Sequence, residues 1–117
     1  AMRLKTKRAH EEPSHNDGTR ILIDRLSPRG VKKAASATDL WLKEIAASDE
    51  LCKWFGHEPE KWGEFKRRYG RELDGMDDAV KTLMEKAREK TVTLVYTAKD
   101  QAHNSAVALK EYIEKKV

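Results

Sequence analysis

Two short apolar runs, far apart in the sequence and each followed by a polar loop, constrain the fold more than any other feature. Residues 20–26 are rich in β-branched and aliphatic side chains, and the run ends at proline and glycine, which stop regular structure. Residues 92–96 have the pattern of a buried strand, and the polar residues 97–104 lead into an amphipathic helix. Because helical segments separate the two runs, we predict an α/β fold with at least partly parallel strands.

The remaining segments predict one further strand and a series of helices. Residues 4–9 alternate apolar and basic side chains, which favours a strand, and residues 36–48 predict a helix capped by Ser36 or by Thr38 with Asp39. Further helices are predicted over residues 48–55, after Pro59, over the stripe at 79–87, and at the end of the chain. We therefore expect a small, mostly parallel central sheet of three to four strands flanked by helices, in one domain spanning residues 1–117.

Composition and charge limit the classes of partner. Charged residues make up 38% of the 117 positions, and 24 basic against 20 acidic residues give a net charge of +4, a mild excess that favours anionic partners without requiring nucleic acid. The single cysteine, Cys52, excludes an intramolecular disulfide and a cysteine-based zinc site, and fits a reducing cytoplasm. No run approaches the roughly 20 apolar residues that span a bilayer, so we expect a cytoplasmic protein with no membrane partner.

Polar side chains follow both central strands and form the candidate site. Carboxyl ends of parallel strands meet at one edge of a sheet, and backbone N–H groups converge at the start of the following helix. Arginine forks and such a helix terminus would hold a phosphate, sulfate or carboxylate, with His57 or Asp100 as acid or base if the protein is an enzyme. The predicted ligand-binding residues are Asp24, Arg25, Arg29, Tyr96, Lys99, His103 and Asn104, and His103 could also move a proton.

Structural roles are the alternative for several of these residues. Asp24, Arg25 and Lys99 could form an ion-pair network that locks the loops, and Asn104 could simply cap the last helix. His57 could close the helix that ends before Gly56. Cys52 lies among core-like neighbours, which favours a buried filler over a nucleophile.

An interaction module is the alternative from a different class of function. The basic helix 60–73 carries Lys66, Arg67, Arg68 and Arg71 and could contact a protein or nucleic acid, but Glu60, Glu64 and Glu72 dilute its charge. Its aromatic residues recur at helical spacing, which favours a core over a base-stacking platform and disfavours nucleic acid. The four histidines lack the i, i+4 pairing of a helical metal site, so neither a metal nor another cofactor is expected.

The sequence also resembles a known family in several motifs spread along nearly the whole chain. They are Asp17-Gly18-Thr19-Arg20, residues 24–30, 41–46, 53–57 and 62–69, Thr93-Leu94-Val95-Tyr96, Ala98-Lys99-Asp100 and His103-Asn104. In order and combination they resemble the DUF488 family, in its YeaO-like branch. The resemblance implies a small α/β protein with a central sheet flanked by helices, and it assigns no activity.

Departures from the family pattern affect the candidate site. This chain has Ser27, Ala47 and Cys52 where the branch usually has tryptophan, proline and arginine. Other DUF488 branches carry a cysteine after the last strand and a Cys-His-Arg at the following helix, a layout similar to phosphatase or rhodanese loops. Tyr96 and Asn104-Ser105-Ala106 occupy those places here, so the resemblance implies that no cysteine nucleophile acts from this loop.

Overall fold

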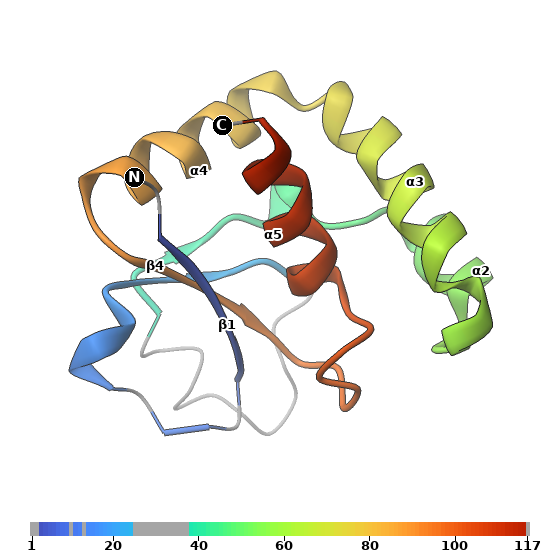
Figure 1. Ribbon diagram of the computed structural model, residues 1–117, viewed down its shortest axis with the longest axis horizontal. Helices are drawn as coiled ribbons and strands as arrows, with labels where there is room; N and C mark the ends of the chain where they lie inside the picture. Colours follow the sequence, from blue (N-terminus) through green and yellow to red (C-terminus); the bar gives the residue numbers. More distant parts are fainter. Residues whose placement is uncertain (1–2, 10, 13, 25–37, 117) are drawn as a thin grey trace.

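The structure is a computed structural model that describes residues 3–9, 11, 12, 14–24 and 38–116. Its centre is a four-stranded sheet in which every neighbouring pair of strands is parallel, as expected for a small α/β fold (Figure 1). In spatial order the strands are β1 (Leu4–Arg8), β4 (Val92–Tyr96), β2 (Thr19–Leu22) and β3 (Leu40–Trp41). The two predicted central strands, β2 and β4, are therefore direct neighbours.

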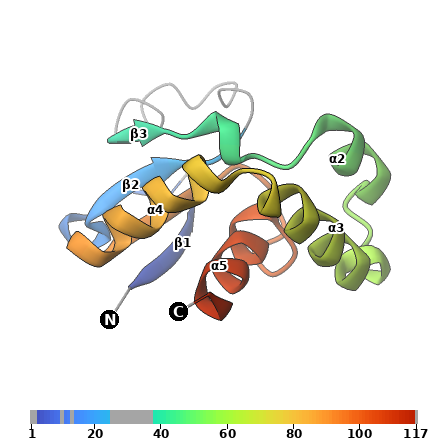
Figure 2. The same cartoon turned by 90° about the horizontal axis from the view of Figure 1, so that it is seen from above.

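In the part of the chain that the structure describes, four α-helices contribute apolar stripes to one core with the strands. Residues from each of these helices join Ile21, Val92 and Leu94 in this core, while Leu22 and Val95 belong to a small second cluster with Ala9. Figure 2 shows that α2 and α3 are set to one side of the sheet. The helices are α2 (Asp49–Phe55), α3 (Trp62–Asp74), α4 (Asp77–Glu89) and α5 (Ser105–Lys115), with 3-10 turns η1 (His15–Asp17), η2 (Lys43–Ile45) and η3 (Pro59–Lys61).

Local signals correctly predicted several helix ends. The Ser48 hydroxyl accepts a hydrogen bond from the Leu51 N–H at 3.1 Å and caps α2, which ends at Gly56 in the left-handed conformation (φ 53°). Pro59 begins the 3-10 turn that leads into α3. These caps depend on neighbours in the chain, which is why the sequence alone could locate them.

The helix predicted over residues 36–48 is wrong where the structure describes this segment. Residues 40 and 41 form β3 beside β2, with the Asp39 N–H donating to the Arg20 carbonyl at 2.7 Å and the Leu42 N–H to the Leu22 carbonyl at 2.9 Å. Trp41 remains 40% exposed, and its indole N–H donates to the Asp24 carbonyl at 2.6 Å. Pairing with β2 therefore overrides the local helical pattern; Ser36 lies outside the described residues.

The predicted strand over residues 20–26 is shorter than expected. β2 ends at Leu22, although the Ile23 N–H still donates to the Val95 carbonyl at 3.2 Å. Asp24 then leaves the sheet, and residues 25–26 lie outside the described part of the chain. The polar loop therefore begins earlier than the apolar pattern suggested.

A buried ion pair lies at the start of β2. The Arg20 guanidinium contacts the Asp17 carboxylate at 2.5 Å, both residues are 4% exposed, and the Lys7 ammonium lies 3.2 Å from the same oxygen. Burial opposes ionisation of Asp17, but hydrogen bonds from the Ser14 N–H, Lys7 and Arg20 outweigh it and lower the pKa of the carboxyl. The ionised carboxylate therefore stabilises the folded chain.

Replacing this carboxylate should destabilise the protein. We expect Asp17→Asn to cost about 3 kcal/mol in the free energy of unfolding near pH 7, because a buried guanidinium loses its counter-charge. The folded pKa is the lower one, so the wild-type advantage is complete above the unfolded pKa of about 3.9 and disappears as the pH falls through the folded value. Urea unfolding at several pH values measures both effects.

Glu114→Gln is the control, because Glu114 forms an exposed ion pair with Lys110. This substitution should change the free energy of unfolding by less than about 0.5 kcal/mol at every pH.

Candidate functional site

The loops that follow β2 and β4 start from the same edge of the sheet and are hydrogen-bonded to each other. The two strands are parallel and in register from Thr19 beside Val92 to Leu22 beside Val95. One Asp24 carboxylate oxygen accepts hydrogen bonds from the Thr97 N–H at 3.1 Å and from the Thr97 hydroxyl at 2.5 Å. Two segments distant in sequence thus form one wall of a site.

A cavity of about 740 Å³ opens at this edge. It brings together seven of the predicted site residues: Asp24, His57, Tyr96, Lys99, Asp100, His103 and Asn104. The two predicted arginines, Arg25 and Arg29, lie outside the described residues. The cavity has the size of a small-molecule site and a mixed lining of polar and apolar side chains.

Asp100 and His103 form a hydrogen-bonded pair in the cavity lining. The His103 Nδ1 lies 2.9 Å from one Asp100 oxygen, and the Ala102 and His103 N–H groups donate to the other at 2.9 and 3.0 Å. The hydrogen bond with His103 is the main cause of a lowered Asp100 pKa, so the carboxylate is ionised and Nδ1 must donate to it. The other ring nitrogen, Nε2, is then left for a ligand. The His103 and Trp62 rings are nearly perpendicular, with their centroids 5.3 Å apart.

Asn104 has the structural role that was considered as an alternative. It is 3% exposed, its Oδ1 accepts from the Val107 N–H at 3.0 Å, and its Nδ2 donates to the Asp100 carbonyl at 2.9 Å. Asn104 is therefore the N-cap of α5 and connects that helix to the Asp100 loop. Because Ser105 also lines the cavity, the first turn of α5 faces it.

Burial shifts the pKa of two further lining groups upward. Burial raises the pKa of the Asp24 carboxyl, and the two hydrogen bonds from Thr97 offset part of that effect. Burial likewise raises the pKa of the Tyr96 phenol, which keeps the hydroxyl protonated at neutral pH.

His57 follows the end of α2 in an unusual backbone conformation. Its φ is 59°, in the left-handed region that residues with a Cβ rarely adopt, and it directly follows Gly56 in the same region. The side chain is exposed and its ring centroid lies 6.4 Å from that of Phe55. His57 thus lies at a helix end and on the cavity lining at once.

Sequence reasoning missed much of the cavity wall, and the prediction that Cys52 is buried is wrong. Cys52 is exposed on α2 and lines the cavity, with its Sγ 3.9 Å from the Ala47 carbonyl. The helical spacing could have indicated this exposure. Leu51 and Phe55, one turn apart, mark the buried face of α2, and Cys52 is not on that face. The other lining residues that were not predicted are Ile23, Ala46, Ala47, Asp49, Phe55, Phe65, Thr97, Ala98 and Ser105.

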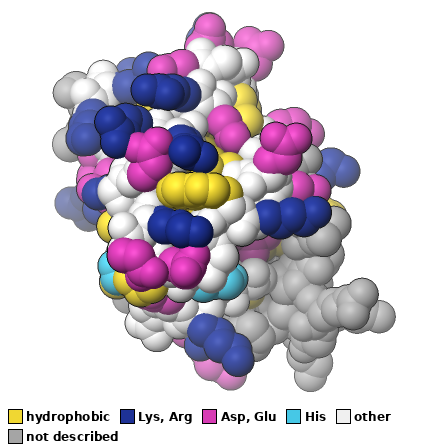
Figure 3. All heavy atoms as spheres, turned by 90° about the vertical axis from the view of Figure 1, so that its right-hand side faces the viewer, with side chains coloured by type: hydrophobic (Ala, Val, Ile, Leu, Met, Phe, Trp, Pro, Cys, Tyr) yellow, Lys and Arg dark blue, Asp and Glu magenta, His cyan; other side chains and the backbone are white. Residues whose placement is uncertain are grey.

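The basic side chains of the predicted interaction helix are largely paired with acidic ones. Glu64 is bonded to both Arg67 and Arg68, and Lys66 lies 3.4 Å from Glu111 on α5. Figure 3 views the molecule from the side of α2 and α3 and shows Lys and Arg side chains intermixed with Asp and Glu. No continuous basic stripe is seen on this face of the described structure.

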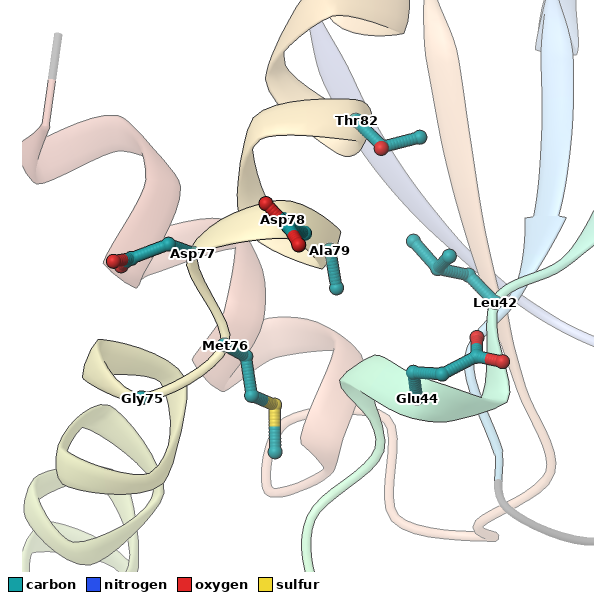
Figure 4. A pocket seen from close by; sticks show the side chains of 8 residues that line it. All are labelled: Leu42, Glu44, Gly75, Met76, Asp77, Asp78, Ala79 and Thr82. Carbon is teal, nitrogen blue, oxygen red and sulfur yellow. The ribbon is translucent and has the colours of Figure 1, made fainter.

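A second cleft of about 610 Å³ lies between η2 and the start of α4 (Figure 4). It is shallow and open, and its charged side chains are all acidic: Glu44, Asp77 and Asp78. Within the described ranges, no group of three or more His, Cys, Asp or Glu residues is arranged to hold a metal ion. In the same part of the chain, no helix is both long and apolar enough to cross a membrane.

The contact between Asp24 and Thr97 can be tested through the Asp24 pKa. We expect Thr97→Val to raise this pKa further, because the substitution removes a hydrogen bond that favours the ionised form. Carboxyl NMR titration measures the shift. Thr82→Val on α4 is the matched control and should leave the Asp24 titration unchanged; an unchanged titration in Thr97→Val would contradict the contact.

Comparisons with known proteins agree with the family resemblance. Residues 3–117 match the family described as the inactive DUF488-N3 subclade. The uncharacterized protein YeaO of Escherichia coli (strain K12) is 38% identical over 112 residues, which cover 96% of this chain and 97% of the relative. The uncharacterized protein Rv3073c of Mycobacterium tuberculosis (strain ATCC 25618 / H37Rv) is 34% identical over 107 residues, covering 92% and 89%. No solved structure matches the chain. The chain belongs to the DUF488 family, in its YeaO-like branch.

Proposed function

We propose that this chain binds a small anionic ligand in the cavity at the carboxyl ends of β2 and β4, without a covalent step on a cysteine. The observation that carries the proposal is the meeting of the two strand-end loops around one cavity of about 740 Å³, with the Asp100–His103 pair and the first turn of α5 in its lining. Such a site at the strand ends of an open α/β sheet is the usual place for a ligand.

Hydrogen-bond donors in the lining support an anionic ligand. Asp24 accepts two hydrogen bonds from Thr97, and Asp100 accepts from His103 and from two backbone N–H groups, so these two carboxylates are hydrogen-bonded within the chain. The Lys99 ammonium, the His57 and His103 rings and the first N–H groups of α5 are then the donors available to a ligand. The sequence predicts Arg25 and Arg29, which lie outside the described residues, as further donors.

A binding role accords with the absence of a cysteine at the family positions. Asn104 is occupied as a helix cap, and Tyr96 keeps its phenol proton, so neither residue can replace a thiolate. Cys52 lies on α2 and not on the loop after β4. The word "inactive" in the description of the matching subclade agrees with a non-covalent role.

Acid–base catalysis by His57 or Asp100 stays a prediction, and for Asp100 it is restricted to a role other than that of an acid. The lowered pKa of Asp100 makes it a partner that orients His103 rather than an acid near neutral pH.

The alternative function is contact with a protein or nucleic acid through helix 60–73. It is the weaker proposal, because the basic side chains of this helix are paired with acidic ones. The cytoplasmic location expected from the sequence is part of this proposal.

Ligand binding should be measured with a panel of inorganic phosphate, sulfate, simple carboxylates and phosphorylated metabolites, by thermal shift and calorimetry. We expect Lys99→Ala or His103→Ala to weaken a binding anion about tenfold or more, because a charge-assisted hydrogen bond contributes about 1.5–3 kcal/mol. Lys81→Ala, an exposed change on α4, is the control and should leave the affinity unchanged. The absence of any binding anion across the panel would contradict the proposal.

Cys52 offers an independent readout because it is the single cysteine in the sequence and lines the cavity. We expect a bound anion to slow the alkylation of Cys52 by iodoacetamide at least severalfold, since the ligand covers the cavity. The loss of the thiol signal with time measures the rate. At an anion concentration a few times the wild-type dissociation constant, the Lys99→Ala variant should lose most of this protection; undiminished protection in the variant would place the ligand elsewhere.

A further inference from the structure

The cavity is lined by apolar walls as well as by polar groups, and the two kinds of lining come mainly from different elements. The polar groups that could meet an anion come largely from the loop after β4 and the start of α5. The apolar walls come from the segments after β2 and η2, from α2 and α3, and from Ala98; they are Ile23, Ala46, Ala47, Phe55, Phe65 and Ala98.

The aromatic part of this wall is fixed by packing. Phe55 on α2 and Phe65 on α3 have ring centroids 4.6 Å apart, and Trp62 stacks on Phe65 at 5.6 Å. Phe55 is 5% and Phe65 2% exposed, so these rings are held in place before any ligand arrives. A preformed apolar wall increases the affinity for a ligand that carries an apolar group.

We propose, resting on the function proposed above, that the ligand is an amphiphilic organic acid: an acidic head at Lys99, His103 and the start of α5, and an apolar body against the Phe55–Phe65 wall. A strongly hydrated inorganic anion makes no use of the apolar lining. An apolar body covers the part of this lining that water still reaches and leaves water itself, and each buried methylene strengthens binding about fourfold. The apolar wall therefore selects the class of ligand, and the polar groups fix its orientation.

The test is a series of acids of increasing apolar size, measured by calorimetry on the full chain. We expect the dissociation constant to fall about fourfold per methylene from acetate through butyrate to hexanoate, with phenylacetate in the range of the longer acids. Hexanamide, which has the same body without the charge, should bind at least tenfold more weakly than hexanoate.

A matched pair of variants tests the wall itself. Ala98 is half-buried in the cavity lining, and Ala98→Leu should weaken hexanoate about tenfold while it changes the affinity for acetate less than twofold. Ala79→Leu makes the same change at a half-buried position in the cleft beside α4 and should affect neither acid. If Ala98→Leu fails to fold, the series on the unmodified chain decides the question.

The outcomes distinguish failure of this inference alone from failure of both proposals. Acetate or inorganic phosphate binding as tightly as hexanoate would overturn the apolar-body inference and leave anion binding in place. Hexanamide binding as tightly as hexanoate would overturn the acidic head, and with it both proposals. Binding of no member of the series, and of no phosphate, would likewise overturn both.

Discussion

The parallel pairing of β2 with β4 is the contact on which the rest of the structure depends. It begins at an unusually close approach, because Gly18 has a φ of 66° and a Cβ at this position would lie 2.1 Å from the Thr91 carbonyl oxygen. The Thr19 N–H donates to the same carbonyl at 2.9 Å, which starts the register. Glycine is thus required both for its backbone conformation and for the space that the neighbouring strand occupies.

The same pairing gives the sheet two different faces. Alternate residues of β2 and β4 join the helices in the main core, while the other face carries the small apolar cluster with Leu22 and Val95. On that second face the Thr93 hydroxyl donates to the Asp17 carbonyl at 2.7 Å. Lys5 and Lys7 lie on β1 at the sheet edge, and charged side chains on an edge strand discourage pairing with another chain. The opposite charge of Asp17 compensates part of the hydration that Arg20 loses, while the Arg20 Nε and Nη2 atoms are buried without a hydrogen-bond partner among the described residues.

The site follows from where these strands end. The Thr97 contacts with Asp24 connect the two loops, and Asn104 connects the second loop to α5, so the Asp100–His103 pair is held by structure on both sides. Two aspartates in one cavity have their pKa values shifted in opposite directions by their surroundings: burial raises that of Asp24, and hydrogen bonds lower that of Asp100. A cavity lining with fixed geometry and distinct polar groups is suited to orienting a ligand, which is the basis of the proposed function.

The sequence by itself determined the elements whose signals are local. Apolar periodicity indicated the helices, and the caps Ser48 and Asn104 marked the starts of α2 and α5. The apolar runs indicated β2 and β4, and the motifs indicated the family, because such signals depend on residues close in the chain. Only the tertiary structure decided that Leu40 and Trp41 form a strand, since their partners are Ile21 and Leu22. It also placed Cys52 at the cavity and brought Phe55 and Phe65 to its wall beside the loop after β4. These are contacts between distant segments, and their energies are set by burial and pairing that no single segment encodes.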